Sequence, residues 1–376
     1  FIKNLHRKIL QMIYCNNCIL PNTRPNIFIL KNGVCSACDY HLKKKINWNK
    51  RKSDFKSLVK KIKKKKLLYD CLIPVSGGKD STWQVLIAKK FGLNPLGFTY
   101  RPPLRNKIGQ KNLDNLKKIG LHHIEFSVDI DTERKFIKKS FLNYGAVAIP
   151  FHMAMWNMSI NLAQKFNIPL IIWGENSARE YGGSHKDRKL KNLNKEWISK
   201  YGVNFNTTIF DWIDKDLSKK NLAPFVKEKE NSSSKKIKSI FLGDYFKWDP
   251  EHTYKFSKKH GFKNLKGKVK TGIYNYADLD DNLISIHHYL KIFKFGFSRS
   301  FDNLSLEIRN KRLSRSKAIE IIKKKGFKKP TQDIKTFCKF VNISASKFES
   351  ICEKFRNKKI WIRNSRKRWK LKFPLR

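Results

Sequence analysis

The stretch Asp70-Cys-Leu-Ile-Pro-Val-Ser-Gly-Gly-Lys-Asp-Ser-Thr82 joins a short apolar run to a glycine-rich turn. The apolar run ends at Val75 and has the length of a buried strand. After the turn, apolar residues recur at helical spacing from Thr82 to Ala88. The stretch therefore predicts a strand, a loop and a helix in immediate succession.

The loop has the composition of a phosphate-binding site. Gly77 and Gly78 allow a tight turn that brings backbone N–H groups against phosphate oxygens, and the following helix directs the positive end of its dipole at them. Ser76 and Ser81 add hydroxyl donors, Lys79 adds charge, and Asp80 offers an oxygen ligand for Mg²⁺. The spacing differs from Gly-x4-Gly-Lys-Ser/Thr, so this is not the kinase-type phosphate loop.

The same strand and helix pattern continues on the C-terminal side of the loop. We expect strands at 94–99, 124–126 and 168–173 and helices at 109–119, 132–142 and 152–166. Strands that alternate with helices predict an α/β fold with a doubly wound parallel sheet, which binds ligands at the carboxyl ends of its strands. Gly174 and Glu175 follow the last of these strands, so we place them at that edge.

Four of the seven cysteines form two Cys-x2-Cys pairs separated by sixteen residues: Cys15, Cys18, Cys35 and Cys38. Two such turns supply four thiolates in a tetrahedron, which suits Zn²⁺ and leaves no open coordination position. The sequence thus predicts a structural zinc knuckle, with disulfides as the less favoured alternative. Cys71, Cys338 and Cys352 are isolated and read as core or surface residues.

Composition sets limits on the class of protein. The chain has 376 residues, and 40% of them are hydrophobic, which excludes a disordered basic tail protein. Lys and Arg exceed Asp and Glu by 52, a charge that invites a nucleic-acid partner, but Lys recurs along the whole chain and general compositional drift explains it better. No apolar run of about 18 residues occurs, and no signal peptide is evident, so we expect no membrane insertion and a cytoplasmic location.

Further patterns divide the chain into five segments. We expect an upstream extension at 1–11 with Met12 as the natural start, and a zinc-knuckle module with a connecting helix at 12–66. Residues 67–180 form the α/β domain, and 181–248, where the pattern fades, form an insertion or lid. Residues 249–376 are predicted to be helical before a basic tail at 361–376, with helices at 250–260, 283–295, 304–310, 315–325, 331–341 and 345–356.

The hexapeptide from Ser76 to Ser81 resembles the signature of the PP-loop ATP pyrophosphatases. That superfamily cleaves ATP between the α and β phosphates, forms an adenylated intermediate and displaces AMP with a nucleophile. The resemblance implies that residues 67–180 are a PP-loop domain of the adenine nucleotide alpha hydrolase-like type, with ATP and Mg²⁺ as cofactors.

From Met12 to about residue 325 the chain also resembles the N-acetyl sugar amidotransferases of bacterial surface-polysaccharide and nonulosonic acid biosynthesis. The motifs that carry this resemblance are Ile13-Tyr-Cys-Asn-Asn-Cys18, the second cysteine pair, Pro74–Ser81, Ile171-Ile-Trp-Gly-Glu-Asn176, Tyr181-Gly-Gly183, Gly243-Asp-Tyr-Phe246, Ile286-His-His-Tyr-Leu290 and Lys294-Phe-Gly-Phe297. It implies a synthetase that adenylates a carbonyl of a nucleotide-activated acetamido sugar and substitutes ammonia, in the biosynthesis of lipopolysaccharide O-antigen or a related glycan.

Candidate site residues follow from the residues and the resemblance together. Lys79, Asp80 and Glu175 are the expected catalytic residues, and we expect Gly174 beside the nucleotide. Glu175 would act as an acid/base or Mg²⁺ residue, with helix capping as its alternative role. Candidates for substrate contact, each weighed against a core or solvated role, are His152, Asn176, Tyr181, His287, His288, Arg299 and Arg309, together with Arg312.

Two expectations concern partners and alternatives. No cysteine stands in a glutaminase motif, and the resemblance implies separate ammonia-supplying subunits similar to the glutaminase and cyclase of imidazole glycerol phosphate synthase. The alternative function is a PP-loop enzyme that modifies tRNA, for example by thiolation. That chemistry needs a sulfur carrier, and only Cys338 and Cys352 follow the loop, so a nucleic-acid partner is not expected.

Overall fold

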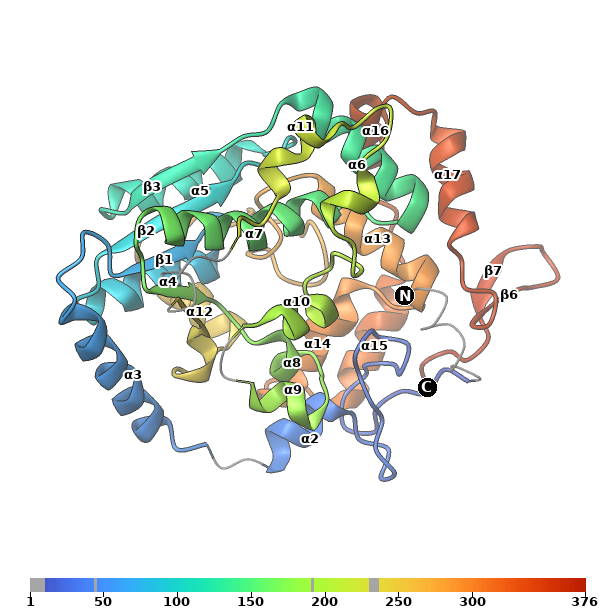
Figure 1. Ribbon diagram of the computed structural model, residues 1–376. Helices are drawn as coiled ribbons and strands as arrows, with labels where there is room; N and C mark the ends of the chain where they lie inside the picture. Colours follow the sequence, from blue (N-terminus) through green and yellow to red (C-terminus); the bar gives the residue numbers. More distant parts are fainter. Residues whose placement is uncertain (1–10, 44–45, 191–192, 230–236) are drawn as a thin grey trace.

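The main sheet of the computed structural model has five parallel strands and lies toward one side of the molecule in the view of Figure 1. The structure describes residues 11–43, 46–190, 193–229 and 237–376; the expected extension therefore lies outside the described residues except for Gln11, as do parts of the Lys-rich runs at 43–45 and 227–236. The strand order is β3-β2-β1-β4-β5, with bounds β1 (Cys71–Pro74), β2 (Pro95–Tyr100), β3 (His122–Phe126), β4 (Leu170–Trp173) and β5 (Lys238–Phe241).

Helices cover both faces of this sheet because successive strand residues point to opposite sides. In β1, Leu72 packs on one face, while Cys71 and Ile73 pack on the other. The Leu72 face is covered by α6 (Ile130–Tyr144) and α7 (Ile149–Lys165); the opposite face is covered by α3 (Trp48–Lys63), α4 (Lys79–Lys90), α5 (Lys107–Lys118) and α12 (Pro250–Lys258). The predicted α/β doubly wound class is confirmed.

The edge strand β5 is not among the predicted strands. It lies within 181–248, the segment for which the sequence predicts an insertion or lid, and it pairs with β4 from Leu170↔Lys238 to Trp173↔Phe241. This strand has only four residues and follows a Lys-rich segment. Its two apolar residues, Ile240 and Phe241, are too few to give a periodic pattern.

The rest of that segment contains short helices, most of which pack on the α7 side of the sheet. Its apolar side chains, including Trp197, Trp212 and Phe225, join the core of that face. The helices of the segment are α9 (His185–Lys189), α10 (Lys195–Tyr201), η1 (Ile209–Trp212), α11 (Lys219–Leu222) and η2 (Ala223–Phe225). The short helix α8 (Ser177–Glu180) precedes the segment, and η4 (Leu242–Asp244) follows β5.

The C-terminal part is helical, as predicted, up to a small hairpin. Its helices after α12 are α13 (Leu283–Phe295), α14 (Arg299–Arg309), α15 (Arg315–Lys325), α16 (Thr331–Val341) and α17 (Ala345–Lys354). Helix α14 begins five residues earlier than the predicted 304–310. The basic tail contains an unpredicted antiparallel pair, β6 (Trp361–Arg363) and β7 (Trp369–Leu371). Each strand has three residues and includes a basic one, so the sequence shows no apolar alternation there.

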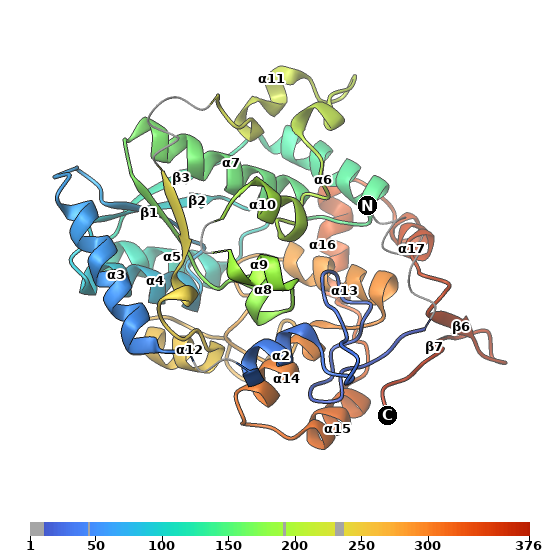
Figure 2. The same ribbon diagram turned by 60° about the horizontal axis from the view of Figure 1, so that its bottom comes forward.

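The cysteine-rich N-terminal part packs against these C-terminal helices (Figure 2). Between its cysteine pairs and α3 lies α2 (Ser36–Lys43). The Tyr14 hydroxyl donates to the Phe373 carbonyl at 3.1 Å, and the Thr23 hydroxyl donates to the Phe295 carbonyl at 2.6 Å. Residues from the two ends of the described chain thus share one apolar cluster.

Within the described residues, no helix is long and apolar enough to cross a membrane.

Candidate active site

The carboxyl ends of β1 and β4 meet at the point where the strand order reverses. The chain runs from β1 outward to β3 and then returns to the other side of β1 at β4. Open α/β sheets bind ligands at such a switch point. The glycine-rich loop follows β1, and Gly174 and Glu175 follow β4, so the sheet brings the two predicted motifs together.

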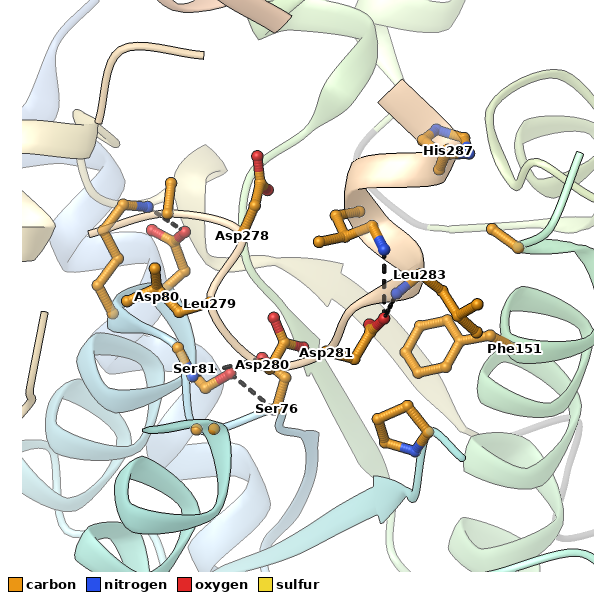
Figure 3. Close-up of a pocket in the computed structure, with 18 of the residues that line it drawn as sticks. Ser76, Asp80, Ser81, Phe151, Asp278, Leu279, Asp280, Asp281, Leu283 and His287 are labelled. Atoms are coloured by element: carbon orange, nitrogen blue, oxygen red, sulfur yellow. Dashed lines mark hydrogen bonds and ion pairs between the residues drawn. The ribbon is translucent and has the colours of Figure 1, made fainter. Parts of the chain in front are cut away.

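The loop from Ser76 to Ser81 is held in a tight turn by its own side chains. The Ser76 backbone N–H donates to the Ser81 hydroxyl at 3.0 Å, and the Gly78 N–H donates to the Ser76 hydroxyl at 3.3 Å. Gly77 has a φ of +85°, a region that side chains disfavour. The turn leaves the N-terminal end of α4 facing the cavity, as phosphate binding requires (Figure 3).

Replacing Gly77 by alanine should damage this loop more than the same change at Gly78. A Cβ at Gly77 would lie 2.6 Å from the Leu113 backbone nitrogen in α5, in addition to the backbone strain of positive φ. A Cβ at Gly78 would meet only the Ser76 hydroxyl, at 3.3 Å, and the φ there is −64°. We expect Gly77→Ala to cost roughly 1–3 kcal/mol of unfolding free energy and to weaken ATP binding. Denaturant unfolding and nucleotide titration measure both effects; equal stability of the two variants would contradict this reading.

Residues far along the chain fix the orientation of Asp80 and Lys79. The Trp248 indole N–H donates to Asp80 Oδ1 at 2.9 Å, and the Thr253 hydroxyl donates to the same oxygen at 3.1 Å. Lys79 contacts the other Asp80 oxygen, and its carbonyl accepts from the Ser257 hydroxyl at 2.7 Å. Trp248 precedes α12, while Thr253 and Ser257 belong to it, so this helix positions the loop; the sequence analysis missed all three residues.

An acidic segment, Asp278-Leu-Asp-Asp281, runs across the cavity from the glycine-rich loop (Figure 3). Burial and the charge of Asp280 raise the pKa of Asp281 to about 7. Burial also opposes ionisation of Asp278, but the nearby Arg299 and His288 outweigh it and hold the pKa of Asp278 well below its usual range. Asp281 is therefore only partly ionised at neutral pH, which limits repulsion of a bound anion.

Glu175 is half-buried at the junction of this cavity with a second one. Burial and the negative charge of Asp80 raise the pKa of Glu175 to about 7, so the carboxyl can exchange a proton near neutral pH. The alternative capping role belongs to its neighbour instead, because the Asn176 side chain accepts from the Ala178 N–H at 3.1 Å and caps α8.

Most predicted site residues line one cavity of about 280 Å³. The predicted residues in it are Ser76, Gly77, Gly78, Lys79, Asp80, Ser81, His152, Glu175, Tyr181, His287 and Arg299. The cavity also contains residues that the sequence analysis missed, among them Glu133, Trp248, Tyr274, Tyr276 and the acidic segment. Their positions in the sequence are scattered, and no local pattern marks them.

Five predicted residues lie elsewhere. Gly174 faces the Gln84 side chain, the buried Asn176 caps α8, and His288 lines the second cavity. Arg309 donates to the Glu180 carbonyl at 2.6 Å and lies 4.0 Å from the Cys18 sulfur, while Arg312 pairs with Asp249 at 2.7 Å. These contacts give Asn176, Arg309 and Arg312 structural partners outside the cavity.

The four cysteines of the two pairs form one buried cluster. Their sulfur atoms all lie within 4.8 Å of one another, and the Cys18 and Cys35 sulfurs are 3.8 Å apart. A tetrahedral zinc with Zn–S bonds of about 2.3 Å requires S···S edges of about 3.8 Å, so the residues fit this metal. The Cys35 backbone N–H also donates to the Cys15 sulfur at 3.1 Å, as befits a thiolate.

The surroundings of the cluster connect it to the site. The Arg315 guanidinium donates to the carbonyls of Cys15 and Cys18, and Arg309 joins the cluster to the segment that follows Glu175 and Asn176. On the other side, Arg188 donates to the Ser36 carbonyl at 2.8 Å. Arg309 thus links the cysteine cluster to α8, the helix that begins two residues after Glu175.

A family model described as "LPS biosynthesis protein WbpG-like, C-terminal domain" matches residues 251–375. No curated protein matches the chain at a significant level.

Solved structures with similar folds include three enzymes or enzyme subunits. NMN synthetase from Francisella tularensis is 12% identical, with a TM-score of 0.27, over 60% of this chain and 100% of that one. NH3-dependent NAD synthetase from Campylobacter jejuni is 16% identical, with a TM-score of 0.29, over 44% and 82%. A predicted subunit of tRNA methyltransferase from Methanocaldococcus jannaschii is also 16% identical, with a TM-score of 0.29, over 62% and 91%.

The Ser76–Ser81 loop at the switch point of the parallel sheet forms a site suited to phosphate groups. The C-terminal third of the chain is similar to a domain of a lipopolysaccharide-biosynthesis protein.

Proposed function

We propose that this chain is the synthetase component of an ATP-dependent amidotransferase, and that its substrate is a nucleotide-activated acetamido sugar of lipopolysaccharide or a related glycan. The observation that carries the proposal is the complete Ser76–Ser81 loop, which opens on a cavity shared with Glu175. The match of residues 251–375 to a lipopolysaccharide-biosynthesis domain supports the choice of a sugar substrate.

In the proposed reaction a carbonyl oxygen of the sugar attacks the α-phosphorus of ATP, and pyrophosphate leaves as its bond to that phosphorus breaks. Ammonia then attacks the carbonyl carbon, and AMP departs with the former carbonyl oxygen. The N-terminal end of α4 and Lys79 bind the phosphates, while Glu175 accepts a proton from the attacking ammonia. Asp80 would hold Mg²⁺, since its carboxylate is a hard oxygen ligand in the cavity, and the ion would neutralise phosphate charge.

A substrate panel tests this function. The purified chain is incubated with ATP, Mg²⁺, ammonium and each of several nucleotide-activated acetamido sugars, and the nucleotide products are separated. We expect AMP and pyrophosphate in equal amounts, formed only when the correct sugar is present. ADP as the product would overturn the proposal, and AMP formation that requires tRNA instead of a sugar would favour the base-modifying alternative.

The chain alone should use ammonium but not glutamine. Glutamine hydrolysis needs an accessible nucleophilic cysteine. Four cysteines are committed to the cluster, and the other three are buried, with burial raising the pKa of the Cys71 and Cys352 thiols. We therefore propose that separate subunits similar to a glutaminase and cyclase pair supply ammonia. Glutamate release by the purified chain that matches product formation would refute this.

A further inference from the structure

A second cavity, of about 310 Å³, lies beside the one that contains the glycine-rich loop. The two cavities share Glu175, Tyr181, His287 and Arg299 as lining residues. A molecule in the second cavity can therefore contact Glu175. This arrangement suits a reaction between two substrates, because both cavities border the same carboxyl group.

Basic side chains from four separate parts of the fold converge on this second cavity. They come from the cysteine-rich part, α10, α13 and α14: Arg24, Lys200, Lys291, Lys294 and Arg299. Two of these helices, α13 and α14, belong to the region that matches the lipopolysaccharide-biosynthesis domain. The general Lys excess of the chain does not explain the arrangement, because compositional drift places lysines mostly on solvated faces.

Lys200 is already paired with Asp187 at 2.9 Å and Glu196 at 3.2 Å, but the other four basic groups share fewer carboxylates. Three cations surround the fully buried Asp302: Arg24 at 2.8 Å, Lys291 at 2.9 Å and Arg299 at 3.6 Å. Arg299 has a second carboxylate, Asp278, at 3.3 Å from its Nε. Asp302 is thus the carboxylate that pairs with both Arg24 and Lys291, and Arg299 divides its contacts between Asp302 and Asp278.

Lys294 is the clearest unbalanced charge. Lys294 is 4% exposed, and its ammonium group donates to the Gly145 carbonyl at 2.8 Å. In the described parts of the chain, no carboxylate forms an ion pair with it. Burial and the neighbouring Lys291 lower the pKa of Lys294 to about 7, so a bound anion would increase the fraction of Lys294 that is protonated at neutral pH.

We propose that the second cavity binds an oxyanion carried by the sugar substrate, either a phosphate or a carboxylate, and thereby directs the substrate carbonyl toward Glu175. This inference rests on the proposed function. Lysine and arginine side chains are the groups that recognise such oxyanions, and a buried charge-assisted contact is stronger than an exposed one. The specificity for the sugar then resides in α13 and α14, while the glycine-rich loop serves ATP.

Variants of the two α13 lysines test this assignment. Lys294→Met and Lys291→Met remove one charge each while they keep an unbranched apolar stem. Lys317→Met on the exposed face of α15 is the matched control, because Lys317 pairs with Glu320 at the surface and lines neither cavity. Calorimetric titration without ATP uses UDP-N-acetylglucosamine as the phosphate probe and glucuronic acid as the carboxylate probe, with N-acetylglucosamine as the uncharged reference.

We expect the native chain to bind one charged probe at least about 10-fold more tightly than the uncharged sugar, and each α13 variant to lose roughly 10- to 100-fold of that affinity. The charged probe that binds identifies the source of the oxyanion. ATP affinity should change less than about 2-fold in both variants, which a general loss of structure would not allow. Saturable binding of neither charged probe, or loss of ATP affinity equal to the loss of probe affinity, would overturn the assignment.

Failure of this inference is distinguishable from failure of the proposed function. If a sugar drives AMP formation while both α13 variants keep the native KM for that sugar, the function stands and the cavity assignment fails. If the variants lose probe binding but no sugar drives AMP formation, the assignment stands and the proposed reaction fails. If Lys294→Met does not fold, Lys291→Met still provides the test. In Lys291→Met the buried Asp302 keeps Arg24 as its partner.

Discussion

Asp80→Asn should abolish sugar-dependent AMP formation while the protein keeps its fold. The amide retains an oxygen that can accept from Trp248 and Thr253, but it loses the charge that holds Mg²⁺ and pairs with Lys79. Removal of one preorganised electrostatic contact at a reacting phosphate lowers turnover by roughly 100- to 1000-fold. Asp80→Ala should lower turnover at least as much, because it also removes the hydrogen bonds from Trp248 and Thr253.

The two Asp80 variants separate charge from positioning when they are measured side by side. Product formation is followed by nucleotide chromatography, and the melting temperature reports on the fold. Asp131→Asn is a matched control, because Asp131 forms ion pairs only at the surface, with Arg134 and Lys135. If Asp80→Asn kept more than a tenth of native turnover, the role of Asp80 in phosphate transfer would be wrong.

Loss of the metal from the cysteine cluster should have the largest effect on stability. We expect one zinc per chain, and Cys35→Ser should remove it. The cluster is the centre of an apolar core that includes Phe297 and Phe301, and structural zinc sites contribute on the order of 10 kcal/mol to the folding of small modules. Because the same core supports the segment after Glu175, Cys35→Ser should also abolish activity.

Elemental analysis and thermal unfolding check this result. Cys338→Ser serves as the control, since Cys338 is buried but lies outside the cluster, so its variant should keep the zinc and lose only about 1–2 kcal/mol. Freshly purified, reduced protein without zinc would count against the metal. So would a Cys35→Ser variant that retains it.

The part of the site predicted from the sequence is the part whose signals are local. The strand before Ser76 and the helix after it have their own periodicity, and the cysteine pairs have their own spacing. The contacts to Asp80 carry no such signal, because Trp248 and Thr253 lie 168 and 173 residues away in the sequence. Only the packing of α12 on α4 creates them.

Arg309 illustrates why a residue type alone misleads. It shares α14 with Arg299, which does line the cavity, but a separation of ten positions corresponds to about 15 Å along a helix and a different face. Arg309 consequently reaches the cysteine cluster and not the cavity. The strand β5 was missed for a related reason, since its place is set by pairing with β4 and not by its own residues.

The shared core of Cys15 to Cys38 with Phe295 to Leu375 bears on how the chain is made. During synthesis the cysteine-rich part leaves the ribosome more than 250 residues before the helices that cover it. Its apolar side chains and four thiols are therefore exposed to solvent until those helices are made. Its final packing is a late, long-range event, whereas the parallel sheet can assemble before it. Early capture of zinc by the nascent chain would protect those thiols from oxidation during this interval.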